Sequence, residues 1–280
     1  MRARDLFIGG FKMMKTYQKT ALMIIVPLFL LNMLTQYMSN KMTMGAMEQA
    51  LANPESFNPM AMMGPVLLTM LISIFIGAVV AVAWHRRALL DEAFTWSPSQ
   101  IFRGPVFSYI LWIIVLMLII LLVSLAIGFV GGMVIALLVA ISPALAAIVG
   151  IPAYIAFILF LVVYMTRISV ILPARAVERP ITIKEALAAT KGQGWMIIRY
   201  TLLTFVVFMI VLIPLMLPSI MAQTNMMNGV VTDPAEIMAA SQPSMISLIL
   251  ISAFSAVVGL YQIGIMTILY STFVGTKEIA

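Results

Sequence analysis

The chain has 280 residues, of which 63% are hydrophobic and 9% are charged, and its formal net charge is +6. Soluble domains are roughly half apolar, so a chain with a mean hydropathy of +1.13 has too few polar side chains to cover a water-soluble fold. Cysteine is absent, which excludes disulfides, thiolate metal sites and cysteine nucleophiles. The composition predicts an integral membrane protein.

Several apolar runs approach or exceed the ~20 residues that a helix needs to cross a bilayer. They do not alternate between apolar and polar residues as the strands of a membrane barrel do, so each span is expected to be a helix that satisfies its own backbone. We expect one all-α polytopic domain over residues 1–280. Its spans are expected at about Thr20–Met38, Gly64–Ala83, Val106–Val130, Ile151–Ser169, Met196–Leu217 and Met245–Ser271.

The apolar stretch Gly131–Gly150 lies between the third and fourth of these spans and is interrupted by Ser142-Pro143. It could form a seventh crossing, which would place the basic residues on its two sides on opposite faces of the membrane. A re-entrant or interfacial hairpin keeps those residues on one face, and we favour this interpretation.

The basic residues are distributed unevenly over the six-span topology. With the N-terminus inside, 15 of the 16 basic residues lie inside and only Lys41 lies outside, whereas six of the 10 acidic residues lie inside. The positive-inside rule predicts this bias, so both termini and Thr190 are expected inside, and the loops at Asn53 and Asp233 outside.

A basic inner face attracts anionic lipid headgroups by ~1 kcal/mol per nearby side chain. The candidate contacts with anionic lipid or a protein partner are Arg86, Arg87, Arg103, Arg167, Arg175, Arg179, Lys184, Lys191, Trp195 and Arg199.

The N-terminal part of the chain also raises the question of a signal peptide. A basic segment precedes the first span, and Ala50–Ala52 resembles a cleavage site. Signal peptides are about 15–30 residues long, so this site lies too far along the chain. We expect the first span to be retained.

The chain contains a weak internal repeat. Three segments with apolar and basic faces, beginning at Arg4, Ser97 and Thr182, each lead into an outward span that is followed by a returning one. The pattern predicts three units, each made of an amphipathic elbow helix at the membrane surface and a helical hairpin.

The third elbow has the clearest local signals. Pro173 is expected to end the fourth span, because proline cannot continue the helical hydrogen bonds. The sequence from Thr182 to Glu185 matches a capping box, and Gly192 is placed to terminate the helix. The apolar face of this helix is predicted to comprise Ile183, Ala186, Leu187 and Thr190.

Trp195 is then expected at the headgroup level, and Arg199 is expected to reach the same level. Lys184 and Lys191 are expected to point toward water or phosphate. The segment is interpreted as an elbow on the inner membrane surface. A binding site for a partner or substrate is the alternative.

The segments "TRISVILPARAV" and "KEALAATKGQGW" resemble a pattern found in bacterial multi-pass proteins, including the membrane domain of some bacterial glycerophosphodiester phosphodiesterases and stand-alone relatives in alphaproteobacteria. The segment "AVAWHRRALLDE" is similar to those relatives too. The resemblance implies a bacterial inner-membrane protein and does not imply a reaction. The matching residues are Arg167, Ser169, Pro173, Ala174, Glu185, Ala186, Thr190, Gly192 and Trp195.

The sequence contains little that suggests catalysis. The catalytic domain of those phosphodiesterases needs two histidines with metal-binding carboxylates, whereas this chain has only His85. We expect His85 to be an interfacial anchor; as a base it would need a carboxylate partner, for which Asp91 and Glu92 are nearest in sequence. No ionisable residue lies in the middle of a span, which argues against an ion-coupled pump. Phosphate-loop, nucleophile-elbow and zinc motifs are absent as well.

The 25 methionines suggest one further chemistry, because thioethers suit Cu(I). Methionine also packs adaptably at irregular surfaces, and no histidine or cysteine accompanies these residues, so periplasmic Cu(I) binding is a minor alternative. The outer carboxylates Glu48, Glu55, Asp233 and Glu236 are too scattered for a hard-metal site. The methionines of the outer loops are Met42, Met44, Met47, Met60, Met62, Met63, Met221, Met226, Met227 and Met238.

The sequence therefore predicts a non-catalytic bacterial inner-membrane protein without a cofactor, acting as a scaffold, accessory subunit or envelope-maintenance factor. Its expected partners are anionic membrane lipids and a protein partner or a second copy of the chain, and not nucleic acid. The alternative function is a passive transporter or facilitator of a lipid or another amphiphile.

Overall fold

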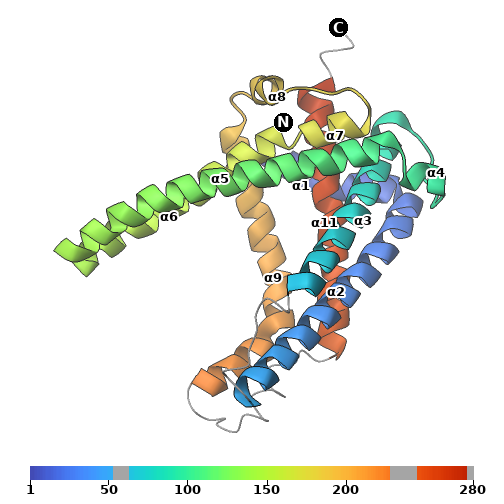
Figure 1. The fold of residues 1–280 in the computed structure, drawn as a ribbon. Coiled ribbons are helices and arrows are strands. Elements are labelled where there is room, and N and C mark those ends of the chain that lie inside the picture. The colour runs from blue at the N-terminus through green and yellow to red at the C-terminus, as the bar shows by residue number, and fades with distance from the viewer. Residues whose placement is uncertain (53–62, 228–244, 276–280) are drawn as a thin grey trace. The chain divides into compact units, whose positions relative to one another are not determined.

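A computed structural model describes residues 1–52, 63–227 and 245–275 of the chain (Figure 1). These residues are almost entirely helical and contain no strand, which confirms the predicted all-α class. The expected outer loops at Asn53 and Asp233 lie outside the described residues. In chain order the helices are α1 (Ala3–Thr16), α2 (Gln18–Ala52), α3 (Met63–Leu90), α4 (Pro98–Ile101), α5 (Gly104–Ile141), α6 (Pro143–Ile168), α7 (Ile171–Ala176), α8 (Ile183–Ala189), α9 (Gly194–Met227) and α11 (Met245–Phe273).

Among the described residues, six helical segments are long and apolar enough to cross a membrane. The chain is a multi-pass membrane protein, as its composition predicts. The helix order also follows the expected repeat, because a short helix precedes a pair of long ones three times. The six segments are Gln18–Met42, Val66–Leu90, Pro98–Ile141, Pro143–Ala176, Gly194–Leu217 and Met245–Phe273.

The stretch Gly131–Gly150 comprises the end of α5 and the start of α6, which pack against each other, and the expected re-entrant or interfacial hairpin stays a prediction. α5 and α6 run through it as continuous helices of 38 and 26 residues that meet at Ser142. Glycine lowers helix stability by only about 1 kcal/mol, whereas an unpaired backbone group in lipid costs several, so the helices continue through the glycines. The break falls at Ser142 because Pro143 begins α6 and the Ser142 hydroxyl accepts a hydrogen bond from Leu145 N at 3.4 Å.

The chain folds into two compact units. Unit 1 comprises Met1–Gly10, Val82–Leu202 and Gly264–Ala280. Unit 2 comprises Phe11–Ala81 and Leu203–Ile263. The single polytopic domain expected from the sequence thus contains two units, each assembled from segments distant in the chain. Unit 1 contains α4 to α8 and most of the basic residues.

The short helix α7 forms part of the core of unit 1. Its residue Ala174 packs with Val177 and with Tyr270 of α11. Pro173 lies inside α7 and does not end α6, which already stops at Ile168, next to the predicted end of the fourth span at Ser169. A proline is tolerated there because the first turn of a helix has backbone amides without intrahelical partners.

Aromatic rings join the helices of unit 2. The Phe208 ring of α9 lies 5.6 Å from both the Phe254 and the Tyr261 ring centroids of α11. The Phe11 ring of α1 lies 4.7 Å from the Tyr261 ring. The two Phe208 pairs are edge-on, and such pairs add to the free energy of burial.

Candidate functional site

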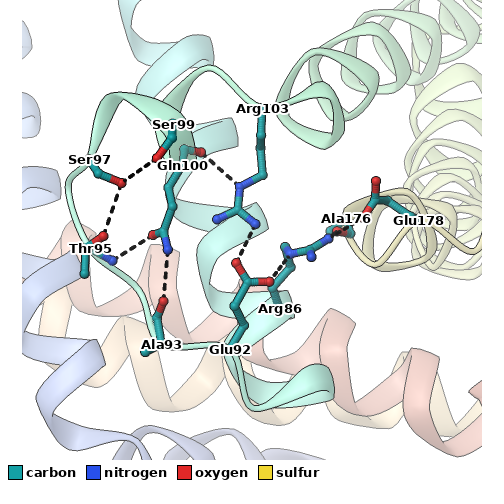
Figure 2. A network of polar contacts seen from close by, with 10 residues as sticks. All are labelled: Arg86, Glu92, Ala93, Thr95, Ser97, Ser99, Gln100, Arg103, Ala176 and Glu178. Atoms are coloured by element: carbon teal, nitrogen blue, oxygen red, sulfur yellow. Dashed lines mark hydrogen bonds and ion pairs between the residues drawn. The ribbon is translucent and has the colours of Figure 1, made fainter.

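Two arginines, one near the end of α3 and one just before α5, converge on Glu92 in unit 1 (Figure 2). Arg86 lies near the end of α3, and its Nε donates to Glu92 Oε2 at 2.6 Å. Arg103 precedes α5, and its Nη1 donates to Glu92 Oε1 at 2.7 Å. The side chains of Arg86, Arg103 and Glu92 are 15%, 16% and 32% exposed. Glu92 therefore joins the end of α3 to the start of α5 through both of its oxygens.

Arg86 also holds the end of α7. Its Nη1 donates to the Ala176 carbonyl oxygen at 3.1 Å and to Glu178 Oε2 at 2.9 Å. A cation is favourable at a helix C-terminus, where carbonyl groups lack intrahelical partners. Glu178 has a φ of 60° and turns the chain out of α7. Arg86 thus ties α3 to α7, and Figure 2 shows it between the two carboxylates.

The link between α3 and α5 is ordered by the amide side chain of Gln100. Its Oε1 accepts from Thr95 N at 2.8 Å, and its Nε2 donates to the Ala93 carbonyl oxygen at 3.1 Å. The Gln100 carbonyl oxygen in turn accepts from Arg103 Nε at 3.1 Å (Figure 2). These bonds hold Arg103 in place for its contact with Glu92.

Glu92 is held in its ionised form. Partial burial alone would raise the pKa of Glu92, but the hydrogen bonds from Arg86 and Arg103 outweigh burial and lower that pKa below its ordinary value. Both carboxylate oxygens are occupied by guanidinium groups, so this site is a structural clamp and lacks a free base. Arg86 and Arg103, which were predicted to contact lipid, form hydrogen bonds within the protein.

His85 is fully buried in unit 1, so the expectation of an interfacial anchor is wrong. Its Nδ1 lies 2.8 Å from Thr267 Oγ1 of α11, and its Nε2 lies 3.3 Å from the Tyr109 hydroxyl of α5. Buried polar groups are costly unless they are hydrogen-bonded, and both ring nitrogens have a partner here. The predicted partner Asp91 instead binds Arg87 at 3.0 Å, and Glu92 binds its two arginines. The ring therefore joins three helices and has no carboxylate beside it.

Arg167 fixes the elbow helix α8. Its Nη2 donates to the Leu187 carbonyl oxygen at 2.6 Å, and its Nε donates to Thr190 Oγ1 at 3.1 Å. Thr190 is buried and donates its own hydroxyl proton to the Ala186 carbonyl oxygen at 2.8 Å. Arg167 therefore satisfies one C-terminal carbonyl group of α8, that of Leu187, and it is a positioning residue whose hydrogen bonds are directed at the protein.

The local predictions for α8 are confirmed. Thr182 and Glu185 form the capping box in both directions. The backbone amide of Thr182, followed by its hydroxyl, donates to the Glu185 carboxylate and lowers its pKa below the ordinary value. Gly192 has a φ of 81°, which is the left-handed conformation that favours glycine. The predicted apolar face is the buried one, since Ala186 and Thr190 are the residues of α8 and its C-cap with the least exposure.

The remaining basic side chains of unit 1 differ from these clamps. Arg175 stacks on the Trp112 ring at 4.8 Å, and Arg199 on the exposed Trp195 ring at 5.1 Å. Lys184 and Lys191 are exposed. None of these four cations forms an ion pair with a described residue. We call the three exposed ones, Lys184, Lys191 and Arg199, the open cations, whereas the Nε of Arg175 is buried. Arg179 lies in the exposed link between α7 and α8.

Unit 2 contains a partly open groove of about 400 Å³ between α2 and α3. Its apolar lining comes from Met42, Val66 and Met70. Its polar lining comes from Thr35, Gln36, Ser39, Thr69 and Ser73. Each helix contributes residues spaced by three or four positions, so each presents one face to the groove. The groove combines a row of uncharged polar groups with an apolar wall.

The described residues contain no group of three or more histidines and carboxylates that could hold a metal ion. Of the methionines proposed as Cu(I) ligands, Met42 lines the groove, and Met63 and Met221 are exposed. Most of the others lie outside the residues whose side chains are described. Copper binding therefore stays a prediction from sequence.

Comparisons with protein-family models, with curated proteins and with solved structures found no match for this chain. The resemblance to the membrane domain of bacterial glycerophosphodiester phosphodiesterases stays a prediction, and function has to be argued from the geometry above.

Proposed function

We propose that this chain is a non-catalytic membrane protein that serves as a scaffold, accessory subunit or envelope-maintenance factor at an anionic membrane surface. The observation that carries this proposal is how the charged groups of unit 1 are divided. Arg86, Arg103 and Arg167 are partly buried and hold helix ends together. The open cations include Arg199, which lies beside the exposed Trp195 ring.

This division suits a protein that must keep its shape while it adheres to lipid phosphates. A tryptophan that is 61% exposed beside an arginine has the character of an interfacial anchor. The excess of basic residues on one predicted face favours a cytoplasmic location of both termini. The resemblance noted above favours the bacterial inner membrane.

The role of the open cations is tested by the double variant Lys184→Gln/Lys191→Gln. At about 1 kcal/mol per basic residue, anionic lipid affinity should fall about thirtyfold at low salt. Native mass spectrometry of the full chain in nanodiscs of zwitterionic lipid, with a small fraction of phosphatidylglycerol, measures the retained anionic lipid. Lys184→Arg/Lys191→Arg is the matched control and should bind normally. Equal retention by both double variants would refute the role.

Gentle extraction from the native membrane tests the scaffold itself. A second protein at fixed stoichiometry is the expected result, and its identity would name the process. The chain alone, without protein partner or ordered second copy, would refute an accessory role.

A second candidate function is passive transport of a lipid or another amphiphile. The groove between α2 and α3 favours it, since an amphiphile needs adjacent polar and apolar walls. Transfer of labelled lipid between the leaflets of vesicles containing the purified chain tests this candidate. Transfer at the rate of protein-free vesicles would reject it.

A further inference from the structure

We propose that the groove between α2 and α3 binds an uncharged lipid whose head carries hydroxyl groups, such as a diacylglycerol. The inference deepens the second candidate function by naming a ligand class. Binding does not require transport, so the two can fail separately. The starting observation is that, of the eight described residues that line it, five are polar and none is charged.

The position of the groove along the spans suits a lipid head. Its α2 residues, Thr35 to Met42, form the end of the first candidate span, and its α3 residues, Val66 to Ser73, form the start of the second. At 1.5 Å per residue, these segments cover roughly 12 Å from the end of each span. Each span has 25 residues, or about 38 Å, against about 30 Å of hydrocarbon, so its outer end would lie where lipid heads give way to acyl chains. A bound lipid would place its polar head among the hydroxyl groups and its chains against the apolar wall.

The hydrogen-bonding groups of the lining favour a ligand with hydroxyl groups. Thr35 donates its hydroxyl proton to the Asn32 carbonyl oxygen at 3.0 Å, and Ser73 donates to the Thr69 carbonyl oxygen at 2.8 Å. The oxygens of Thr35 and Ser73 are therefore left as acceptors. The Gln36 amide makes no hydrogen bond to a described residue, so it can both donate and accept. A hydroxyl group satisfies both requirements, whereas a ligand with carbonyl groups alone cannot donate to Thr35 or Ser73.

The absence of charge among the described lining residues argues against a phosphate-bearing head. A buried anion requires a cation or several donors, and none of the lining residues that the structure describes is charged. The nearest basic residue in sequence, Lys41, is exposed, and its ammonium lies 5.8 Å from the Tyr37 ring centroid. A volume of about 400 Å³ is at the lower end of ligand sites. It accommodates a head and the first carbons of its chains, and the rest of the chains extends into the bilayer.

The test uses the full chain in phosphatidylcholine nanodiscs that contain either diacylglycerol or phosphatidic acid with the same acyl chains. The two probes differ only in the phosphate. Native mass spectrometry should show diacylglycerol bound at least about tenfold more tightly, since the phosphate would be desolvated without a counterion. Equal or stronger binding of phosphatidic acid would overturn the proposal.

Two variants localise the site. Gln36→Leu removes the amide, and Val66→Trp fills the groove from a side chain that is 53% exposed. Each has a matched control outside the lining: Asn32→Leu one turn earlier on α2, and Leu67→Trp at the neighbouring position, which is 52% exposed. We expect both groove variants to lose most diacylglycerol binding and both controls to keep it.

The same loss in a control and its groove variant, or no loss in any variant, would overturn the assignment. If Gln36→Leu does not fold, Val66→Trp decides, because it adds bulk without removing a polar group. Normal binding without transfer between leaflets would refute the transport function and leave this inference intact.

Discussion

Replacing Glu92 tests whether the clamp in unit 1 holds the helix ends together. Glu92→Ala leaves Arg86 and Arg103 without the carboxylate that accepts from both at 2.6 and 2.7 Å. Hydrogen bonds to charged groups contribute about 1.5–3 kcal/mol each. Because Glu92 is 32% exposed, water replaces part of what is lost, and we expect the variant to be less stable by about 2–4 kcal/mol.

The matched control is Glu178→Ala, which removes the other carboxylate that binds Arg86. The Glu178 side chain is 63% exposed, so its pair is screened by solvent and its loss should cost less than about 1 kcal/mol. Unfolding of the purified protein by SDS in mixed micelles, followed by circular dichroism, measures both values. Arg103→Met, alone and combined with Glu92→Ala, completes a double-mutant cycle that isolates one of the two contacts.

The pH dependence gives a second measurement of the same clamp. Since the folded-state pKa of Glu92 is lowered, its stabilisation is fully present above the ordinary carboxyl pKa of about 4.5. It is lost as the pH falls through the lowered folded value. The stability difference between the wild type and Glu92→Gln should therefore be constant from neutral pH to about pH 5 and shrink in stronger acid. Equal destabilisation by Glu92→Ala and Glu178→Ala, or a difference that grows in acid, would refute the reasoning.

Three further predictions concern the other contacts. His85→Leu should lower stability by about 2 kcal/mol in the same unfolding assay, because the buried hydroxyl groups of Thr267 and Tyr109 lose their hydrogen bonds to the ring. If the stability losses of His85→Leu and Tyr109→Phe add fully in the double variant, the two residues do not share a network. Arg167→Met should free the end of α8 and speed trypsin cleavage at Lys184 and Lys191. The control Arg199→Met, at an exposed position, should not change the cleavage rate. Equal cleavage of both variants would contradict the positioning role of Arg167. Thr182→Ala removes the N-cap of α8, which contributes about 1 kcal/mol. Amide hydrogen exchange should therefore become faster within Ile183–Ala189 only. Faster exchange throughout unit 1 would show that α8 is not a separate element.

The features that depend on neighbouring residues could be predicted from the sequence. The apolar runs predict the spans, and the capping box and Gly192 predict both ends of α8, because each signal lies within a few residues of the structure it specifies. The fourth span was predicted to end at Ser169, one residue from the end of α6, but Pro173, to which that end was attributed, lies in the first turn of the next helix.

The clamp and the His85 site could not be predicted in the same way. Arg86 is 92 positions from Glu178, and His85 is 182 positions from Thr267, and no local pattern encodes such pairings. The sequence contains one signal for the Glu92 contacts, because an acidic residue among three arginines at the ends of two apolar runs favours a charge cluster. The sequence does not show which residues pair, so it does not distinguish Arg86 and Arg103 from basic residues that face lipid.

The lengths of α5 and α6 have a mechanical consequence. The 26 residues of α6 extend about 39 Å, against about 30 Å of hydrocarbon, and no charged residue lies between Arg103 and Arg167 to hold any part of the pair at the surface. Leaning is one way in which a helix longer than the hydrocarbon remains within it. By leaning alone, α6 would need an angle of roughly 40° from the membrane normal, and the 38 residues of α5, about 57 Å long, would need nearly 60°. The angle required increases as the membrane becomes thinner. Because α5 starts at the Glu92 clamp and α6 ends at Arg167, a change of membrane thickness would then act on the residues that hold both helix ends.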